Sequence, residues 1–235
     1  MKNNIKIFYH VLLENHWYSV VNEQLSHIKE SGILEHTSWF YISLSTSDNI
    51  DNIEKSEVIQ FFYDYFLNYV YPEDTFYGKK FEVLDCNKSE FEYPTLEKAV
   101  DISKLSKDFV GFYLHTKGVS NPNHVKEHVR DAMNVGCIDN WQEHIIKINE
   151  GYDMSGVNFL EKNNYIKSYK GFYNGNFFFF SPKFFSNVDF SIIDKSNRVY
   201  AESIYGIYYN PKFFNLGYQG VNTPFLKDVR TINKS

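Results

Sequence analysis

The clearest candidate for chemistry in this sequence is the polar segment His115-Thr116-Lys117-Gly118, which follows an apolar run at residues 109–114. That run is typical of a strand covered on both faces in the middle of a sheet. In open α/β sheets, ligands bind outside the carboxyl ends of the strands. His115 and Lys117 can donate hydrogen bonds to phosphate oxygens, and Thr116 adds a hydroxyl. The segment predicts a phosphate-binding site, and the alternative is an ordinary polar loop.

Three polar side chains later in the chain suit complementary tasks. Arg130, on a predicted helix, could grip a diphosphate or a carboxylate, or it could form an ordinary surface ion pair. Asn176 precedes an aromatic run at 177–180; aromatic faces stack on sugar rings and amides bind hydroxyls, while the run by itself is typical of a core strand. Glu202 lies in an apolar stretch that suits a general base, and the alternative is an exposed residue at a helix start.

His124, Glu127 and His128 form the H-x-x-E-H pattern of inverted zinc proteases. In that pattern two histidines one helical turn apart hold zinc, and the glutamate activates water. Glu202 would supply a third ligand from a second helix. A zinc hydrolase is therefore an alternative, although the Asn-Pro-Asn directly before His124 is typical of a loop.

Charge and cysteine content exclude some classes of protein. The 24 Lys and Arg residues against 29 Asp and Glu give a formal charge of −5 and a pI near 5.9, so no overall positive field is available to hold nucleic acid. Cys86 and Cys137 show no C-x-x-C spacing, which fits a reducing compartment. The apolar stretch 5–13 contains Lys6 and His10 and is too short and too polar for a signal peptide or a membrane span. We expect a cytoplasmic protein without a transmembrane segment.

The hydrophobic pattern predicts alternating strands and helices. In the first half, apolar runs and helical spacing together give a β-α-β start with parallel pairing. We expect strand 5–11, helix 17–30, strand 38–45, helix 59–70, strand 81–84, helix 94–103 and strand 109–114. In the second half we expect helices 124–134 and 140–149, strands 154–158 and 176–180, a surface loop at 161–164, and an element at 199–208 that is either helix or strand. This order predicts a single α/β domain over residues 1–235, with a Rossmann-like, mostly parallel central sheet flanked by helices and an irregular α+β second half.

Six short segments resemble, in the same order, a family of small glycosyltransferase-like proteins of bacteria and large viruses, which is usually predicted to adopt the GT-A fold. The segments are Glu92-Tyr93-Pro94-Thr95-Leu96, Tyr113-Leu114-His115-Thr116-Lys117-Gly118, Arg130-Asp131-Ala132-Met133, Gly156-Val157-Asn158, Gly175-Asn176-Phe177 and Ala201-Glu202. The resemblance spans nearly the whole chain. It implies that residues 1–118 bind a nucleotide-diphospho-sugar donor. Residues 119–235 would bind a saccharide, glycolipid or other hydroxyl acceptor, as in polysaccharide biosynthesis.

The chain differs from the family pattern at three places. Val129 stands where the pattern has Trp, Phe178 and Phe179 stand where it has Trp-Trp, and Phe172 stands where it has His. The differences keep apolar surface but remove indole donors and a candidate acid-base group. A saccharide- or nucleotide-binding module on the same fold, without turnover, is therefore the alternative.

GT-A enzymes often hold a divalent metal, Mn²⁺ or Mg²⁺, with an Asp-x-Asp motif after the central strand. This chain has no such motif there and offers His115-Thr116-Lys117 instead. Either Lys117 and Arg130 neutralise the diphosphate without a metal, or other residues hold one.

The resemblance suggests a hypothesis for the donor side. The nucleotide base would lie near Tyr9 and His10, while Lys117 and His115 stabilise the charge that develops on the leaving diphosphate. The other expected substrate-binding side chains are Thr116, Arg130 and Asn158.

On the acceptor side, Glu202, or Asp153 as second choice, would remove the proton from a hydroxyl held by Asn176 and aromatic neighbours. The acceptor oxygen would then attack the anomeric carbon. Direct displacement would invert the configuration at that carbon.

Overall fold

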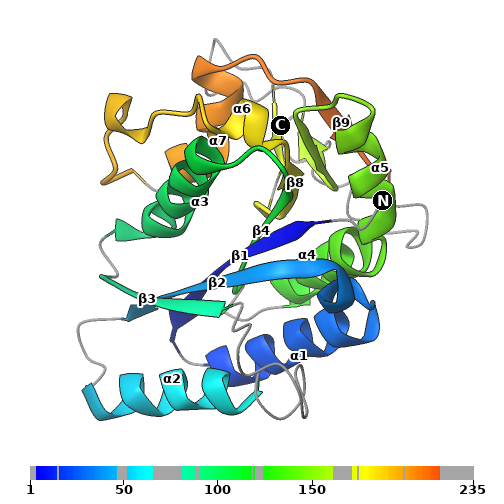
Figure 1. The fold of residues 1–235 in the computed structure, drawn as a ribbon. Helices are drawn as coiled ribbons and strands as arrows, with labels where there is room; N and C mark the ends of the chain where they lie inside the picture. Colours follow the sequence, from blue (N-terminus) through cyan, green and yellow to red (C-terminus); the bar gives the residue numbers. More distant parts are fainter. Residues whose placement is uncertain are drawn as a thin grey trace, which may run out of the picture.

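The computed structural model of the chain is a mixed α/β fold built on one seven-stranded sheet (Figure 1). It describes residues 4–14, 16–46, 52–65, 81–87, 90–117, 119, 124–160, 171–173, 175–197 and 199–217. The strand order is β3-β2-β1-β4-β8-β5-β9, and β8 alone among these seven runs antiparallel to its neighbours. The predicted fold class, α/β with a mostly parallel central sheet flanked by helices, is confirmed.

The bounds of the elements are as follows. The strands are β1 (Ile5–Leu13), β2 (Thr37–Thr46), β3 (Phe81–Asn87), β4 (Val110–His115), β5 (Met154–Gly156), β8 (Phe178–Phe180) and β9 (Phe213–Asn215), with β6 (Phe159–Leu160) and β7 (Phe172–Tyr173) in a separate ribbon. The α-helices are α1 (Trp17–Glu30), α2 (Asn52–Tyr65), α3 (Tyr93–Leu105), α4 (His124–Met133), α5 (Trp141–Asn149), α6 (Pro182–Phe185) and α7 (Val199–Tyr208). Short 3₁₀ turns, η1 (Ile33–His36) and η6 (Phe190–Ile192), and a π-helical turn, η5 (Asn134–Asp139), complete the described elements.

The predicted β-α-β start is confirmed. Strand β1 pairs in parallel with both β2 and β4, and α1 has the bounds that the apolar spacing predicts. Gly32, at φ 74°, turns the chain after α1, in a backbone region that glycine enters without strain. All six residues of β4 are buried, as expected for a central strand with cover on both faces.

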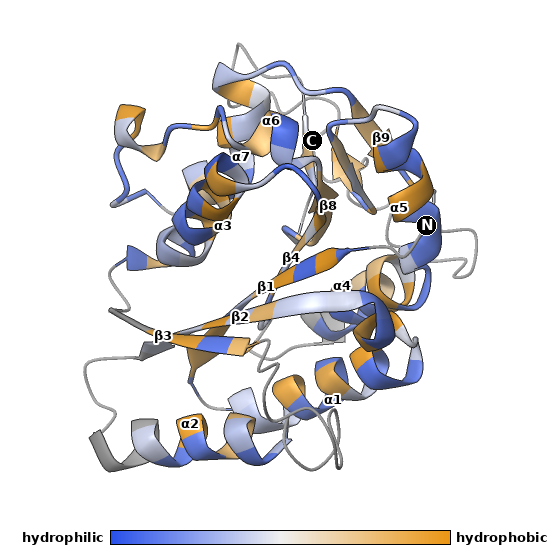
Figure 2. Cartoon of the chain, viewed as in Figure 1, coloured by the Kyte–Doolittle hydropathy of each residue, from blue (hydrophilic) through white to orange (hydrophobic). Residues whose placement is uncertain are grey.

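Because side chains alternate along a strand, β1 serves two cores. Ile7, Tyr9 and Val11 point to the side covered by α1, α2, α4, η5 and α5, which we call the α1 face. Phe8 points to the side covered by α3, α6 and α7, which we call the α3 face. Figures 1 and 2 show the two layers of helices above and below the sheet, with hydrophobic residues turned toward it.

The aromatic run of β8 divides between these two cores. Phe179 stacks on Phe112 on the α1 face, with ring centroids 4.2 Å apart, while Phe178 and Phe180 lie on the α3 face. The run is therefore core, as its composition predicts.

The second half departs from the prediction in detail. Residues 134–139, expected to separate two helices, form the π-helical turn η5 that joins α4 to α5. Strand β5 ends before Asn158 and β8 begins after Asn176, because these two residues adopt left-handed backbone angles, φ 57° and 58°, that no strand allows.

The open choice at 199–208 resolves as the helix α7. Ala201, Ile204 and Tyr205 are buried at helical spacing and face the sheet. The expected helix at 59–70 begins earlier, at Asn52, and is described to Tyr65, while the expected loop at 161–164 lies outside the described residues.

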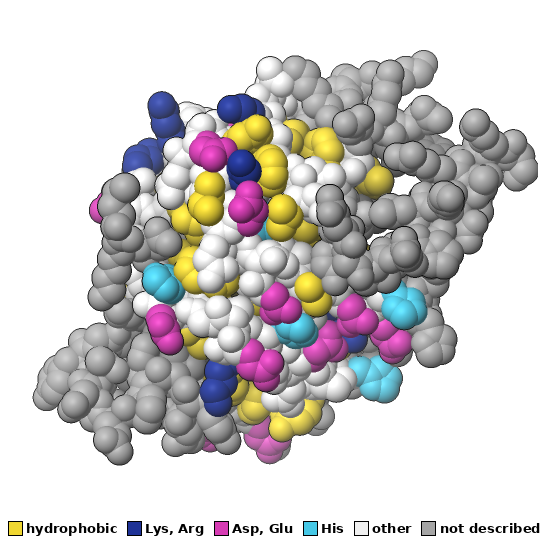
Figure 3. Space-filling model, turned by 90° about the vertical axis from the view of Figure 1, so that its right-hand side faces the viewer, with side chains coloured by type: hydrophobic (Ala, Val, Ile, Leu, Met, Phe, Trp, Pro, Cys, Tyr) yellow, Lys and Arg dark blue, Asp and Glu magenta, His cyan; other side chains and the backbone are white. Residues whose placement is uncertain are grey.

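One side of the molecule is drawn in Figure 3, where carboxylates and histidines gather in the lower half of the view and Lys and Arg are few. This matches the formal charge of −5. Within the described ranges, no helix is both long enough and apolar enough to cross a membrane.

Candidate functional site

The polar segment after β4 lies at the carboxyl edge of the sheet, where β1 holds its backbone. Thr116 N donates to the His10 carbonyl (3.1 Å), and Thr116 Oγ1 accepts from Leu12 N (2.9 Å). Thr116 is 6% exposed. The Thr116 hydroxyl thus satisfies a backbone N–H that the end of β4 leaves without a strand partner, and its expected contact with substrate stays a prediction.

Helix α1 holds the same segment from the α1 face. Gln24 Nε2 donates to the carbonyl of His115 (2.9 Å), and the Tyr9 hydroxyl donates to Gln24 Oε1 (2.5 Å). Tyr9 is fully buried against Phe40 and Phe62, and burial raises the pKa of its phenol well above the ordinary value. The expectation that Tyr9 contacts a nucleotide base is therefore wrong, because its ring is a core side chain.

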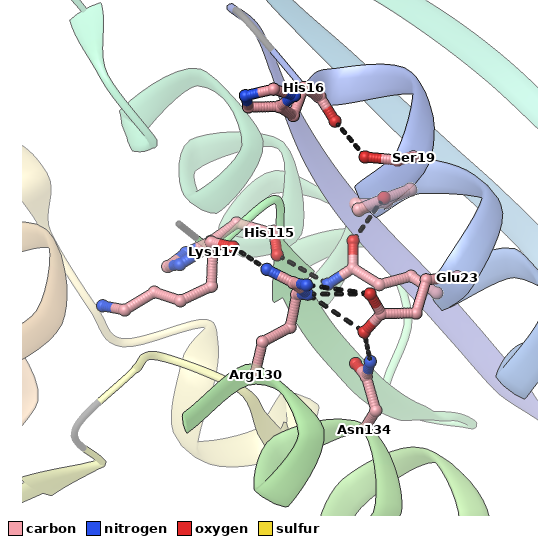
Figure 4. Close-up of polar contacts among 9 residues, drawn as sticks. His16, Ser19, Glu23, His115, Lys117, Arg130 and Asn134 are labelled. Atoms are coloured by element: carbon pink, nitrogen blue, oxygen red, sulfur yellow. Dashed lines mark hydrogen bonds and ion pairs between the residues drawn. The ribbon is translucent and has the colours of Figure 1, made fainter. Parts of the chain in front are cut away.

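Arg130 holds a second backbone carbonyl of the segment, that of Lys117 (Figure 4). Its Nε and Nη2 atoms donate to the Glu23 carboxylate at 2.9–3.1 Å, and its Nη1 donates to Lys117 O (3.2 Å). Asn134 Nδ2 donates to the same carboxylate (2.7 Å). Arg130 is 8% exposed, so its guanidinium is committed to Glu23 and to the backbone. The expected contact of Arg130 with a diphosphate is corrected to a role in positioning Lys117.

On the α3 face, a buried carboxylate gathers three side chains. Glu92, 2% exposed, accepts from the Tyr113 hydroxyl (3.1 Å) and from Asn176 Nδ2 (2.6 Å) at Oε2. Its Oε1 lies 3.3 Å from His115 Nδ1. Asn176 is 1% exposed, so the amide expected to hold an acceptor is bonded to Glu92 instead.

Polar residues continue across the sheet beside this carboxylate. Ser43, His10 and His115 lie in register on β2, β1 and β4 and are 3% exposed or less. His10 Nδ1 is 3.1 Å from Thr95 Oγ1 of α3, so the expectation that His10 meets a nucleotide base is also corrected. Within the described part of the chain, Ser43 Oγ and both ring nitrogens of His115 are buried without a hydrogen-bond partner.

Lys117 and Glu202 meet at the rim of this polar strip. Lys117 Nζ lies 3.9 Å from Glu202 Oε1, and their side chains are 20% and 18% exposed. Lys117 follows β4, and Glu202 lies in the first turn of α7. Tertiary structure therefore brings together two residues that the sequence analysis selected separately. Opposite charges at this distance, partly shielded from water, stabilise each other.

Asp153 and Asn158 lie beyond opposite ends of β5, Asp153 at the amino edge of the sheet and Asn158 at the carboxyl edge. Asp153 immediately precedes β5, which runs in the same direction as β4, so it stands at the amino edge of the sheet, opposite Lys117. Its Oδ2 accepts from Lys212 N (2.8 Å). Asp153 as second-choice base is therefore wrong. Asn158 is half-buried beyond the end of β5, at φ 57°.

The donor atoms for a metal are not brought together in the part of the chain that the structure describes. No group of three His, Cys, Asp or Glu side chains there is close enough to hold an ion. Of the H-x-x-E-H pattern, His128 is exposed and Glu127 is half-buried, while the side chain of His124 lies outside the described ones. The residues after β4 that stand in place of Asp-x-Asp likewise include no carboxylate, so they do not fit Mn²⁺ or Mg²⁺.

Two of the segments quoted for the family resemblance pack directly on each other. A Cβ at Gly175, whose φ is 106°, would lie 2.1 Å from Met133 Sδ. The bend at Gly175 and Asn176 therefore requires glycine at the first position, and it delivers the Asn176 amide to Glu92.

Glu92, Glu23 and Gln24 are site residues that the sequence analysis missed. Glu92 precedes a helix expected to begin at Pro94, and an acidic residue there is ordinary near a helix start. Glu23 and Gln24 are polar residues on a mostly amphipathic helix. The available signal was the place of Glu92 within the first quoted segment, since it is the one carboxylate in that segment.

No protein-family model matches the chain, and no curated protein matches it. A structural match is CMP:2-keto-3-deoxy-manno-octonic acid synthetase in complex with CTP, with a TM-score of 0.38 and 9% sequence identity over 98% of each chain. A likeness at this level defines neither a family nor an activity. The structure defines the class of the protein: it is an α/β protein with a mostly parallel seven-stranded sheet and a polar site at the carboxyl edge of that sheet.

Proposed function

We propose that the protein is a glycosyltransferase that moves a sugar from a nucleotide-diphospho-sugar to a hydroxyl of a glycan, glycolipid or other acceptor. The observation that carries the proposal is the Lys117–Glu202 pair at the carboxyl edge of β4, with Nζ and Oε1 3.9 Å apart. Glycosyl transfer needs a cation for the leaving diphosphate and a base for the incoming hydroxyl, and the pair supplies one of each.

In the proposed reaction, the acceptor oxygen attacks the anomeric carbon of the donor. The bond from that carbon to the diphosphate breaks, with its electron pair leaving on the nucleoside diphosphate. The Lys117 ammonium stabilises that developing charge, and Glu202 takes the proton of the acceptor hydroxyl. Direct displacement inverts the anomeric configuration, and no step of this scheme is routed through a metal.

The scaffold around Lys117 supports this assignment. The carbonyls of His115 and Lys117 are held by Gln24 and Arg130, respectively, so the backbone that carries the ammonium is fixed by bonds from two helices. Electrostatic stabilisation of a leaving group depends on charges that are already in place before the reaction.

The test is incubation of the purified chain with a panel of UDP- and GDP-sugars, with and without simple saccharide acceptors, while release of free nucleoside diphosphate is measured. We expect release from at least one donor, strongly reduced by Lys117→Ala and by Glu202→Gln. Release that persists undiminished in both variants would contradict the assignment of the pair.

A second candidate function is a saccharide- or nucleotide-binding module without turnover. The observation that favours it is that Lys117 and Glu202 neutralise each other in the free chain and that the Asn176 amide is already bonded to Glu92. Saturable binding of a nucleotide-sugar, without any release of nucleotide over hours, would favour the module over the enzyme.

A further inference from the structure

His115 presents an unpartnered nitrogen inside a buried polar cluster. Its side chain is 2% exposed, and within the described residues neither Nδ1 nor Nε2 makes a hydrogen bond. The rings of Tyr113 and Phe177 flank it edge-on, with centroids 6.3 and 5.7 Å away. A buried polar atom without a partner costs free energy, so such an atom in a folded protein calls for a function.

The environment of Glu92 determines which form of His115 is stable. The Glu92 carboxylate accepts from the Tyr113 hydroxyl and the Asn176 amide at Oε2. Its Oε1 lies 3.3 Å from His115 Nδ1, a contact that is not a hydrogen bond in the free chain. A carboxylate oxygen this close to Nδ1 favours the ring form in which Nδ1 carries a hydrogen, because that hydrogen can be donated to it.

Nε2 then carries either a second hydrogen or a lone pair. A hydrogen on Nε2 would be a buried N–H donor without an acceptor among the described residues, which costs free energy. The neutral ring, with Nδ1–H toward Glu92 and a lone pair at Nε2, avoids that cost.

We propose that Glu92 holds the proton of His115 on Nδ1, so that Nε2 accepts a hydrogen bond from a hydroxyl of a bound sugar, and that His115 is a hydroxyl-binding rather than a phosphate-binding residue. The inference rests on the proposed function, because it names the part of the nucleotide-sugar that His115 recognises. Phosphate oxygens at neutral pH are acceptors and cannot satisfy a lone pair, whereas a sugar hydroxyl can. Less than 1 Å² of Nε2 is exposed in the free chain, so the inference requires that binding opens this contact.

The first test needs no ligand. Two-dimensional ¹⁵N–¹H NMR of the ring nitrogens at pH 7.5, assigned with His115→Phe and His144→Gln, reports which nitrogen of each ring carries hydrogen. We expect the Nδ1–H form for His115. His144 is the internal control: its Nε2 faces the Gly136 carbonyl (2.9 Å) and its Nδ1 faces Ser155 Oγ (2.7 Å), so it must show the opposite, Nε2–H form.

Glu92→Gln sharpens this test. The Tyr113 hydroxyl and the Asn176 amide are donors and will take the amide oxygen of the new glutamine, which turns its NH₂ toward His115 Nδ1. We expect His115 to change to the Nε2–H form in this variant. An Nε2–H form or an imidazolium in the wild-type chain at pH 7.5 would overturn the inference, whatever the protein catalyses.

The second test separates the sugar from the phosphates. Affinities are measured by calorimetry for UDP, GDP and their sugar conjugates on the wild type, His115→Phe and Lys117→Ala. We expect His115→Phe to weaken a nucleotide-sugar about tenfold and the free nucleotide not at all, since one hydrogen bond is lost. Lys117→Ala should weaken both. Equal losses of the two ligands in His115→Phe overturn the inference, whereas a wild type that binds no conjugate overturns the proposed function.

Discussion

At the carboxyl edge of the sheet, the polar groups on the α1 face and those on the α3 face differ in how they are hydrogen-bonded. On the α1 face, Arg130 donates to the Glu23 carboxylate and to the Lys117 carbonyl. Gln24 donates to the His115 carbonyl. On the α3 face, His115 and Ser43 hold buried atoms without partners, and the Lys117–Glu202 pair is partly open to water. Charged residues on the first face therefore build a scaffold, while those on the second remain available to a ligand.

The contrast shows why residue type alone does not identify a site. Arginine next to a phosphate-binding segment suggests a phosphate contact, and Arg130 has the expected position. Its guanidinium is nevertheless occupied by the Glu23 carboxylate of α1 and by the Lys117 carbonyl in the segment after β4. In the proposed function, the ligand meets the α3 face, where Lys117 and Glu202 are partly open to water. Four experiments test this difference between the two faces, and they follow in order of decreasing expected effect.

Acid is expected to weaken the α1 face most. His144 is fully buried there, stacked on Phe179, and burial lowers its pKa to about 4. The unfolded chain binds this proton near pH 6.5, so the stabilisation is complete above pH 6.5 and is lost as the pH falls toward 4. The loss is about 3 kcal/mol in the free energy of unfolding. Urea unfolding from pH 7 to 4 measures it.

The matched variant for that experiment is His144→Gln, which removes the titrating group but keeps a polar side chain. Its free energy of unfolding should vary less steeply with pH than that of the wild type. Parallel curves for the two proteins would show that His144 does not titrate as its burial requires.

Loss of the ammonium on the α3 face is expected to act on activity rather than on folding. Lys117→Ala should reduce turnover on the order of a hundredfold, about 2.7 kcal/mol of transition-state stabilisation. Its side chain is partly exposed and its backbone stays held by Arg130, so the unfolding curve should change little. Lys104→Ala, which breaks an exposed ion pair with Asp101, is the control and should leave both unchanged. A Lys117→Ala enzyme with wild-type turnover contradicts the proposed role.

Arg130→Ala tests the scaffold on the α1 face. We expect a loss of about 2 kcal/mol in the free energy of unfolding, since the half-buried Glu23 carboxylate and the Lys117 carbonyl lose their charged donor. Turnover should also fall through displacement of Lys117, and KM for the donor should rise. Lys195→Ala, at an exposed pair with Glu97, is the comparison and should leave stability nearly unchanged. Equal effects of the two variants would contradict the assignment of Arg130 as a buried positioning residue.

His115→Phe should have the smallest effect on stability. Phenylalanine keeps a ring between Tyr113 and Phe177 and removes nitrogen atoms that have no hydrogen-bond partner, so the free energy of unfolding should change by less than about 1 kcal/mol. Denaturant unfolding beside Arg130→Ala measures the difference between the two faces. A loss as large as that of Arg130→Ala would mean that His115 belongs to the scaffold.

Much of the fold could be predicted because the pattern is local. The helix at Trp17–Glu30 and the buried strand Val110–His115 follow from apolar spacing within each segment. The bounds of the second half were less predictable, since the left-handed turns at Asn158 and Asn176 interrupt strands that the hydrophobic run would continue.

The candidate site was predictable in part. Lys117 and Glu202 were selected from their own surroundings, and tertiary structure brings them together. Tyr9, Arg130 and Asp153 were misplaced because their partners, Gln24, Glu23 and Lys212, come from distant segments or from the opposite edge of the sheet. No local pattern encodes such pairings.

By itself, the sequence determined the alternation of strands and helices, the central position of β4 and the polar segment at its end, because hydrophobic spacing acts over a few neighbouring residues. Only the tertiary structure decided which polar groups are used within the protein and which are left for a ligand. Glu92 shows the difference, since its carboxylate lies next to Tyr113 and His115 of β4 and Asn176 before β8, two segments far from it in the sequence. Hydrogen-bond partnership depends on distance in space, and only the folded chain sets that distance.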